Sequence, residues 1–215
     1  MAKKTKKNKT RSKSQPKRQR PVIGVIGAGG RYGQWLMARF TEQGFQVFGA
    51  DVVEGFLTPK KLVQQADVVL FSVPIEETIS VIRSLVPYSR PEQLWVDITS
   101  LKEAPMAAML ESRADVLGLH PMCGPDLPNW NGQTVALCYG RMTDPSWETF
   151  ILEFLKAMKA KFYITDPQEH DRIMAYVQAL PHALSMVMIG TFESMEEHGL
   201  SVSEIEHYAT PPYRL

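Results

Sequence analysis

The sequence predicts an α/β fold: a Rossmann-type, doubly wound, mostly parallel sheet, followed by an α-helical segment. Three observations predict it. Apolar runs without alternation recur along residues 21–165, helical patterns separate them, and a glycine-rich turn follows the first run. Continuous apolar strands that alternate with helices are typical of a parallel sheet covered on both faces. The strand signals stop after Asp166, where a long helical pattern begins.

The first elements form a strand, a turn and a helix. The apolar run VIGVIG ends in glycines, and the helical pattern that starts at Arg31 runs to Gly44. Gly44 is a candidate C-cap because glycine readily adopts the left-handed conformation that ends many helices. A second strand, QVFGAD, ends at Asp51, and Thr58 with Pro59 marks the start of a short helix.

The remaining elements follow the same alternation. Strands are predicted at residues 67–73, 94–98, 115–119, 134–139 and 161–165, and helices at 75–86, 103–112, 146–160 and 167–198. The last helix carries an apolar stripe, which predicts packing against another subunit, as in a homodimer, or against further chain. The stripe consists of Ile173, Val177, Leu180, Leu184, Val187 and Met195.

Charge is distributed unevenly along the 215 residues. Residues 1–20 hold ten of the 24 lysines and arginines and no acidic residue, so we predict a disordered basic tail. The rest of the chain carries 14 basic and 23 acidic side chains, which argues against nucleic-acid binding outside the tail. We interpret the tail as a solvated segment, with contact to an acidic surface or a localisation signal as the alternatives.

Several classes of protein are excluded by composition. Two cysteines, Cys123 and Cys138, make no disulfide framework, and the N-terminus has no secretory signal pattern. We find no run of about 18 apolar residues, which predicts that no segment spans a membrane and favours a cytoplasmic location. The histidines and cysteines lack ligand spacing, so no metal site is predicted.

The turn GAGGRYG, residues 27–33, is predicted to bind the pyrophosphate of a dinucleotide. Glycines between a strand and a helix let the backbone approach phosphate, whose charge the helix N-terminus favours. The spacing of glycines 27, 30 and 33 is one residue longer than the usual motif. The candidate cofactor-binding residues are Gly27, Gly29, Gly30, Arg31, Tyr32, Gly33, Asp51, Ser72, Val73 and Pro74.

Asp51 favours NAD over NADP as the cofactor. A carboxylate at the end of the second strand would accept hydrogen bonds from the ribose hydroxyls and repel a 2′-phosphate. The alternative is that Asp51 is only a turn residue. Arg31 lies within the glycine turn, where it suits the pyrophosphate better than a 2′-phosphate.

Three polar segments follow successive strands: SVP (72–74), DITSLK (97–102) and LHP (119–121). The carboxyl ends of parallel strands meet at one edge of the sheet, where open α/β sheets bind ligands. We therefore expect Ser100, Lys102 and His120 to share that edge. An imidazole suits such a site because, with a reference pKa of about 6.5, it can be neutral and accept a proton at physiological pH.

Taken together, these segments resemble the prephenate dehydrogenase family, the TyrA-type enzymes of tyrosine biosynthesis. The resemblance covers about residues 21–215 and rests on VIGAGGRYGQW, FSVPI, VDITSLKEAPMAAML, VLGLHPMCGPD, EHDRIMAYVQALPHA and TPPYRL. It implies an NAD-dependent oxidative decarboxylation of prephenate to 4-hydroxyphenylpyruvate. Arogenate or an amino-substituted prephenate are alternative substrates, and a non-catalytic, truncated NAD-binding paralogue is the alternative from another class.

The resemblance also implies roles for individual residues. His120 would accept the proton of the substrate's ring hydroxyl, and Ser100 would hydrogen-bond near the same hydroxyl. Lys102, His182 and Arg214 would belong to the substrate-binding residues, Lys102 by shaping the pocket electrostatically and Arg214 by binding a carboxylate.

The expected organisation is a tail (1–20), an NAD-binding domain (21–165) and a helical substrate and dimerisation domain. That last domain would begin at residue 166 and, in family members, continue beyond TPPYRL. Pro181 falls inside the predicted helix just before His182, where it is expected to kink the chain.

Overall fold

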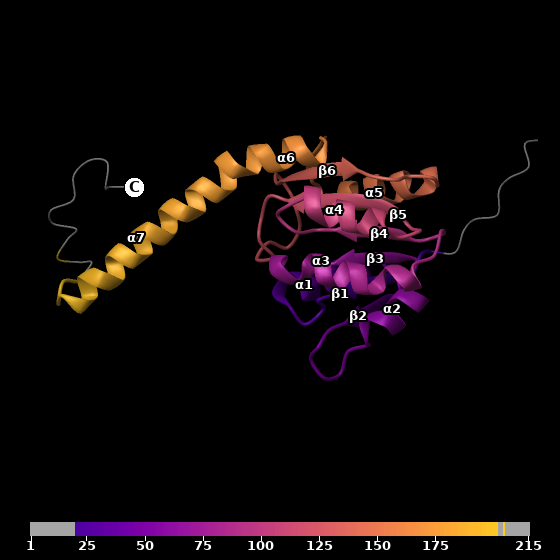
Figure 1. Ribbon diagram of the computed structural model, residues 1–215, viewed down its shortest axis with the longest axis horizontal. Helices are drawn as coiled ribbons and strands as arrows, with labels where there is room; N and C mark the ends of the chain where they lie inside the picture. Colours follow the sequence, from indigo (N-terminus) through magenta and orange to yellow (C-terminus); the bar gives the residue numbers. More distant parts are fainter. Residues whose placement is uncertain (1–19, 202–203, 205–215) are drawn as a thin grey trace, which may run out of the picture.

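The computed structural model describes residues 20–201 and 204, which form a layered α/β body from which one long helix projects (Figure 1). Seven strands form a single sheet in the order β2-β1-β3-β4-β5-β6-β7. Every neighbouring pair is parallel except β5 with β6. The predicted class, a mostly parallel doubly wound sheet followed by helix, is confirmed. Of the predicted basic tail, residues 1–19 lie outside the described residues.

The predicted strands all occur, most with slightly shorter bounds, because apolar β-branched runs between turn residues make good buried strands. Strands β1, β3, β4 and β5 are buried along their whole length, as expected for the centre of a parallel sheet. The strands are β1 (Ile23–Ile26), β2 (Val47–Ala50), β3 (Val68–Phe71), β4 (Leu94–Asp97), β5 (Asp115–Pro121), β6 (Thr134–Tyr139) and β7 (Lys161–Ile164).

Helices cover both faces of the sheet. Helices α1 and α5 enclose one core, in which the rings of Phe40 and Phe154 stack with their centroids 4.1 Å apart. Helices α2, α3 and α4 enclose the other core, with Leu62, Ile82 and Met109 fully buried. The helices are α1 (Arg31–Glu42), α2 (Pro59–Gln65), α3 (Ile75–Leu85), α4 (Glu103–Leu110) and α5 (Pro145–Ala157), with a short 3₁₀ turn η1 (Val86–Tyr88) after α3.

Local sequence explains where the helices begin and end. The Thr58 side chain accepts a hydrogen bond from the Lys61 amide, and Pro59 follows in the first helical turn of α2. Gly44 lies just beyond α1 with φ +78°, the left-handed conformation predicted for it.

The C-terminal helix is continuous but not uniform. It comprises α6 (Pro167–Met174), a π-helical segment η2 (Ala175–Ala179) and α7 (Leu180–Glu197). A kink was expected at Pro181, and the helix runs on through that residue. The turn before it is π-helical, with the Leu180 amide bonded to the Ala175 carbonyl, and such a widened turn accommodates a residue that has no amide hydrogen to donate.

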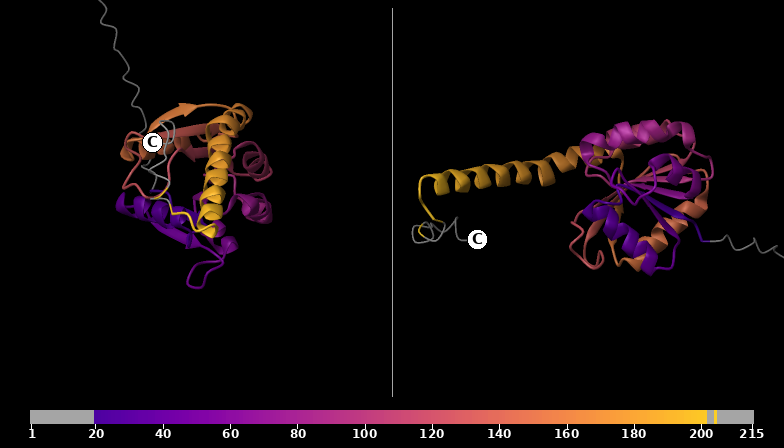
Figure 2. Two further views of the ribbon diagram at one scale, coloured as in Figure 1. Left: turned by 90° about the vertical axis from the view of Figure 1, so that its left-hand side faces the viewer. Right: turned by 90° about the horizontal axis from the view of Figure 1, so that it is seen from below.

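Helix α6 packs beside α4, where Asp171 accepts hydrogen bonds from the Lys102 and Glu103 amides, whereas α7 projects away from the sheet (Figure 1, Figure 2). Every side chain from residue 179 to 191 is exposed, including Leu184 and Val187 of the predicted apolar stripe. The sequence has no run of about 18 apolar residues, but the helix over Pro167–Met195 is long and apolar enough, by length and composition alone, to cross a membrane.

Candidate active site

The glycine turn after β1 is shaped by two close backbone approaches. Gly27 has φ +84°, and a Cβ there would lie 2.2 Å from the Ser72 carbonyl oxygen after β3. A Cβ on Gly33 would lie 2.1 Å from the Gly27 carbonyl oxygen, so only glycine lets α1 start this close to the turn. Glycine is therefore required at positions 27 and 33, whereas Gly30 is the N-cap of α1 in extended conformation.

Asp51 lies beside this turn rather than apart from it. Its Oδ2 accepts a hydrogen bond of 2.8 Å from the Gly29 amide, and its Oδ1 accepts one of 2.8 Å from the Val52 amide. Among residues 20–201, no side chain caps the N-terminus of α1, so the first amides of that helix have no capping carboxylate from this part of the chain. The turn and Asp51 fit a dinucleotide: a phosphate could approach glycine backbone and helix N-terminus, with a carboxylate in reach of a ribose.

The other predicted cofactor residues surround the turn. Ser72 and Val73 touch Gly27, and Pro74 is the N-cap of α3. Arg31 is exposed and forms an ion pair with Asp126, in the loop that follows β5. The same loop is held on α1 by Trp35, whose indole nitrogen donates to the Leu127 carbonyl at 2.6 Å.

A cleft of about 640 Å³ lies between this loop, the segment after β4 and the C-terminal helix. It brings together Tyr32, Ser100, His120 and His182, which the sequence predicted separately. Because His182 lies on α7, the cleft joins the sheet edge to the helical segment. The complete lining is Tyr32, Ile98, Thr99, Ser100, His120, Pro121, Met122, Cys123, Gly124, Met174, Val177, Gln178 and His182. Arg214 lies outside the described residues.

His120 is the penultimate residue of β5 and is only 4% exposed. Burial, with smaller contributions from the nearby charge of Lys102 and from His170, lowers the pKa of His120 to about 3, although Asp171 opposes this. The imidazole is therefore neutral at physiological pH. A neutral ring with one nitrogen at a cleft can accept a proton from a bound hydroxyl.

Lys102 does not line the cleft, contrary to the substrate contact expected of it. Its side chain is fully buried, its ammonium pairs with Asp97 at the end of β4, and it donates to the Leu119 carbonyl at 3.0 Å. A buried ammonium needs such partners, because an unpaired charge in the interior is costly. Lys102 thus supports the backbone next to His120 from beneath.

Ser100 and Tyr32 both line the cleft. The Ser100 hydroxyl accepts a hydrogen bond of 3.4 Å from the Gln178 side chain, so the segment after β4 is tied to η2. Burial raises the pKa of the Tyr32 hydroxyl well above its usual value, with Cys123 contributing in the same direction, so Tyr32 stays protonated.

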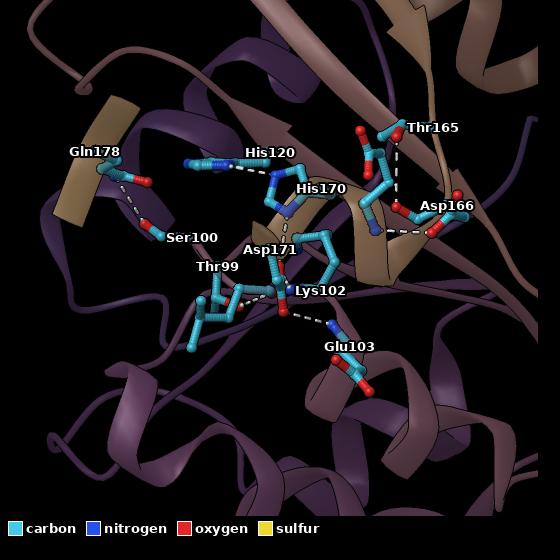
Figure 3. A network of polar contacts seen from close by, with 12 residues as sticks. Thr99, Ser100, Lys102, Glu103, His120, Thr165, Asp166, His170, Asp171 and Gln178 are labelled. Atoms are coloured by element: carbon cyan, nitrogen blue, oxygen red, sulfur yellow. Dashed lines mark hydrogen bonds and ion pairs between the residues drawn. The ribbon is translucent and has the colours of Figure 1, made fainter. Parts of the chain in front are cut away.

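Two residues of the site, His170 and Asp171, were not singled out from the sequence. The His170 ring is fully buried, with Nε2 3.0 Å from His120 Nδ1 and Nδ1 2.7 Å from Asp171 Oδ1 (Figure 3). The signal was the adjacent pair His-Asp in EHDRIMA, at the start of a predicted helix. It was missed because contact between α6 and β5 depends on how the C-terminal helix returns to the sheet edge.

Family models match both parts of the chain. The nucleotide-binding domain of prephenate dehydrogenase matches residues 50–164, and the dimerization domain of prephenate dehydrogenase matches residues 166–215. The chain belongs to the prephenate dehydrogenase family. This family membership agrees with the resemblance found in the sequence.

Curated relatives of this prephenate dehydrogenase family member support the same assignment. The chain is 34% identical over 197 residues to the T-protein of Haemophilus influenzae, covering 90% of this chain and 50% of that protein. It is 32% identical over 211 residues to a probable arogenate/prephenate dehydrogenase of Methanocaldococcus jannaschii, covering 90% and 47%. The chain thus spans about half the length of these relatives.

Solved structures share the fold of this family member. Arogenate dehydrogenase from Synechocystis superposes with a TM-score of 0.70 at 20% identity, covering 90% of this chain and 76% of that one. Prephenate dehydrogenase from Aquifex aeolicus superposes with a TM-score of 0.69 at 18% identity, covering 89% and 73%. A structure of prephenate dehydrogenase from A. aeolicus with hydroxyphenyl propionate and NAD+ gives 0.70 at 18%, covering 93% and 74%.

Proposed function

We propose that the chain is an NAD-dependent prephenate dehydrogenase that converts prephenate to 4-hydroxyphenylpyruvate. The observation that carries the proposal is a buried, neutral histidine, His120, in a cleft beside a glycine turn suited to a dinucleotide. When bound, NAD supplies the hydride acceptor. The hydride leaves the ring carbon that bears the hydroxyl, carbon dioxide leaves the ring, and the ring becomes aromatic.

The residues of the chain have distinct parts in this reaction. His120 accepts the proton of the ring hydroxyl, which raises electron density at the carbon that loses hydride. Ser100, on the same cleft, hydrogen-bonds near that hydroxyl. His182 binds the substrate from α7, and Arg214 binds one of its carboxylates.

Asp51 supports NAD rather than NADP as the cofactor. Its carboxylate is held at the glycine turn by backbone amides, so it would accept ribose hydroxyls and repel a 2′-phosphate. Arg31, the nearest cation in the turn, is paired with Asp126. A cofactor with a 2′-phosphate would therefore meet a negative charge without a free positive partner among the described residues of the turn.

The substrate proposal is prephenate, and arogenate is the alternative. The two share the ring and the hydride step but differ at the group that the helical segment would bind. A relative whose printed name carries both substrates, from Methanocaldococcus jannaschii, supports keeping arogenate as the second candidate.

The test is an assay on the purified chain. We expect NAD with prephenate to give NADH absorbance, with lower kcat/KM for NADP and for arogenate. His120→Asn should lower kcat more than about 100-fold, because a positioned base contributes about 10² to 10⁴ in rate. Ile151→Val, in the core between α5 and the sheet, controls for lost packing. An active His120→Asn enzyme contradicts the mechanism. Bound NAD without turnover of either substrate favours a non-catalytic paralogue.

The chain is further proposed to act as a homodimer in the cytoplasm. The match of residues 166–215 to a dimerization domain supports a second copy as the partner of the exposed apolar helix, rather than a membrane. An apolar surface of this kind otherwise meets water.

A further inference from the structure

Three side chains form a chain of hydrogen bonds that ends at the backbone of α4 (Figure 3). His120 Nδ1 lies 3.0 Å from His170 Nε2, and His170 Nδ1 lies 2.7 Å from Asp171 Oδ1. The Asp171 carboxylate also accepts hydrogen bonds from two amides at the start of α4: Lys102 at 2.8 Å and Glu103 at 3.0 Å. This series of hydrogen bonds thus links β5, α6 and α4.

These hydrogen bonds have a defined direction, because the carboxylate of Asp171 at the far end can only accept hydrogen bonds. Both oxygens of the Asp171 carboxylate face donors, so His170 must donate to it through Nδ1. A neutral His170 then carries its lone pair on Nε2, and His120 must donate to it through Nδ1. His170 is fully buried, so solvent does not offer it other partners.

We propose that His170 and Asp171 are positioning residues that fix the tautomer of His120, with the proton on Nδ1 and the lone pair on Nε2. The opposite direction would require an imidazolium at His170, a second positive charge buried in a site that already holds the Lys102 ammonium. Nε2 of His120 is the nitrogen turned away from His170, toward Ser100 and Gln178 (Figure 3).

The consequence for the reaction rests on the proposed function. With its lone pair on Nε2, His120 can take the proton of the ring hydroxyl without first losing one. The imidazolium that results donates to His170, whose partner Asp171 is the negative charge that favours it, while Lys102 opposes it. Tyr32 and His182 are the other titratable groups on the cleft that face His120, and Cys123 lies beside Tyr32.

The tautomer is tested directly by nitrogen NMR of the five histidines in ¹⁵N-labelled chain, with His120 assigned by His120→Asn. We expect His120 to carry its proton on Nδ1 at neutral pH. His170→Leu removes the acceptor and should shift His120 toward the other tautomer, whereas His170→Gln offers an amide oxygen near the position of Nε2 and should restore it. A proton on Nε2 in the unsubstituted chain, or no change in His170→Leu, overturns the proposal.

Kinetics then measure what the tautomer contributes. With NAD and prephenate, His170→Leu should lower kcat about tenfold or more with KM for NAD within about twofold, and His170→Gln should recover most of the loss. Ile151→Val should change neither value. If the unsubstituted chain turns over neither prephenate nor arogenate, the proposed function fails while the NMR result still decides the tautomer. If it turns over and His170→Leu keeps the unsubstituted kcat, the positioning role alone fails.

Discussion

At the scale of single residues, the site depends on what surrounds each titratable group rather than on its type. Burial and the nearby charge of Lys102 keep His120 neutral, whereas the Lys102 ammonium pairs with Asp97 and donates to the Leu119 carbonyl. The two residues lie close together but have opposite requirements. His120 needs a lone pair at the cleft, whereas the buried ammonium of Lys102 needs hydrogen-bond acceptors around it.

Activity should persist as the pH falls below the ordinary pKa of histidine. Because burial lowers the pKa of His120 to about 3, the free enzyme keeps its proton acceptor neutral through pH 6.5. We expect the acid limb of kcat/KM for prephenate to lie well below pH 6.5. If the acid limb lies close to pH 6.5 and remains in His120 variants, another group titrates there. If it lies close to pH 6.5 and is assigned to His120, the lowered pKa of His120 is contradicted.

Stability should change with pH in the same window. Above about pH 6.5 the side chain of His120 is neutral in both the folded and the unfolded chain, so it adds no pH dependence. Between about 6.5 and 3 only the unfolded chain binds the proton, so the free energy of unfolding should fall with falling pH. Urea denaturation of the native chain and His120→Asn, compared from pH 7 to 4, isolates this contribution.

Lys102→Met should be strongly destabilising although Lys102 touches no proposed ligand. It leaves the carboxylate of Asp97 buried without its counter-ion, and breaking one partner of a buried pair costs about 3–5 kcal/mol. The double variant Lys102→Met with Asp97→Leu removes both charges and should recover part of that loss. Urea denaturation measures all three chains, and equal stability of Lys102→Met and the native chain would contradict the buried pair.

At the scale of elements, the glycine turn and the C-terminal helix show two ways in which backbone geometry prepares a site. The turn needs glycine where α1 closes on β1, and η2 lets one helix pass through Pro181 and still bring His182 to the cleft. The sequence pattern placed the first correctly. For the C-terminal helix the sequence predicted only a kink at Pro181, because no sequence pattern indicates the widened turn before the proline.

Two alanine substitutions in the same turn should differ sharply in stability. Gly33→Ala forces a Cβ to within 2.1 Å of the Gly27 carbonyl oxygen and should cost about 2 kcal/mol or more, whereas Gly30→Ala meets the same oxygen at 3.3 Å. Gly30 has φ −72° and ψ 158°, which alanine also adopts, so we expect its cost to stay below about 1 kcal/mol. Thermal or urea denaturation of both variants decides; equal losses would contradict the close approach.

At the scale of the whole molecule, the α/β body and the projecting helix have different relations to solvent. The body has a buried core on each face of the sheet, whereas α7 leaves its apolar side chains exposed. The proposed second copy would cover these side chains. Because His182 on the same helix lines the cleft, dimer formation would also affect the shape of the cleft.

Sedimentation should show a dimer at micromolar concentration. Replacing Leu184 and Val187 by lysine places two charges on the exposed apolar surface and should shift the chain to monomer while leaving the body folded. Circular dichroism of the variant controls for loss of the helix itself. A native chain that sediments as a monomer at these concentrations would contradict the proposed assembly.

The sequence by itself determined the order and type of the elements and the edge at which the site lies. Apolar runs, caps and the glycine turn act over a few residues, and parallel strands necessarily bring their carboxyl ends together, so Ser100 and His120 could be assigned to one edge. Only the tertiary structure decided that Lys102 points beneath that edge and that His170 and Asp171 complete the hydrogen bonds of His120. The physical reason is that burial and hydrogen-bond direction depend on how α4 and α6 pack together, a contact between residues about 70 positions apart that no local pattern encodes.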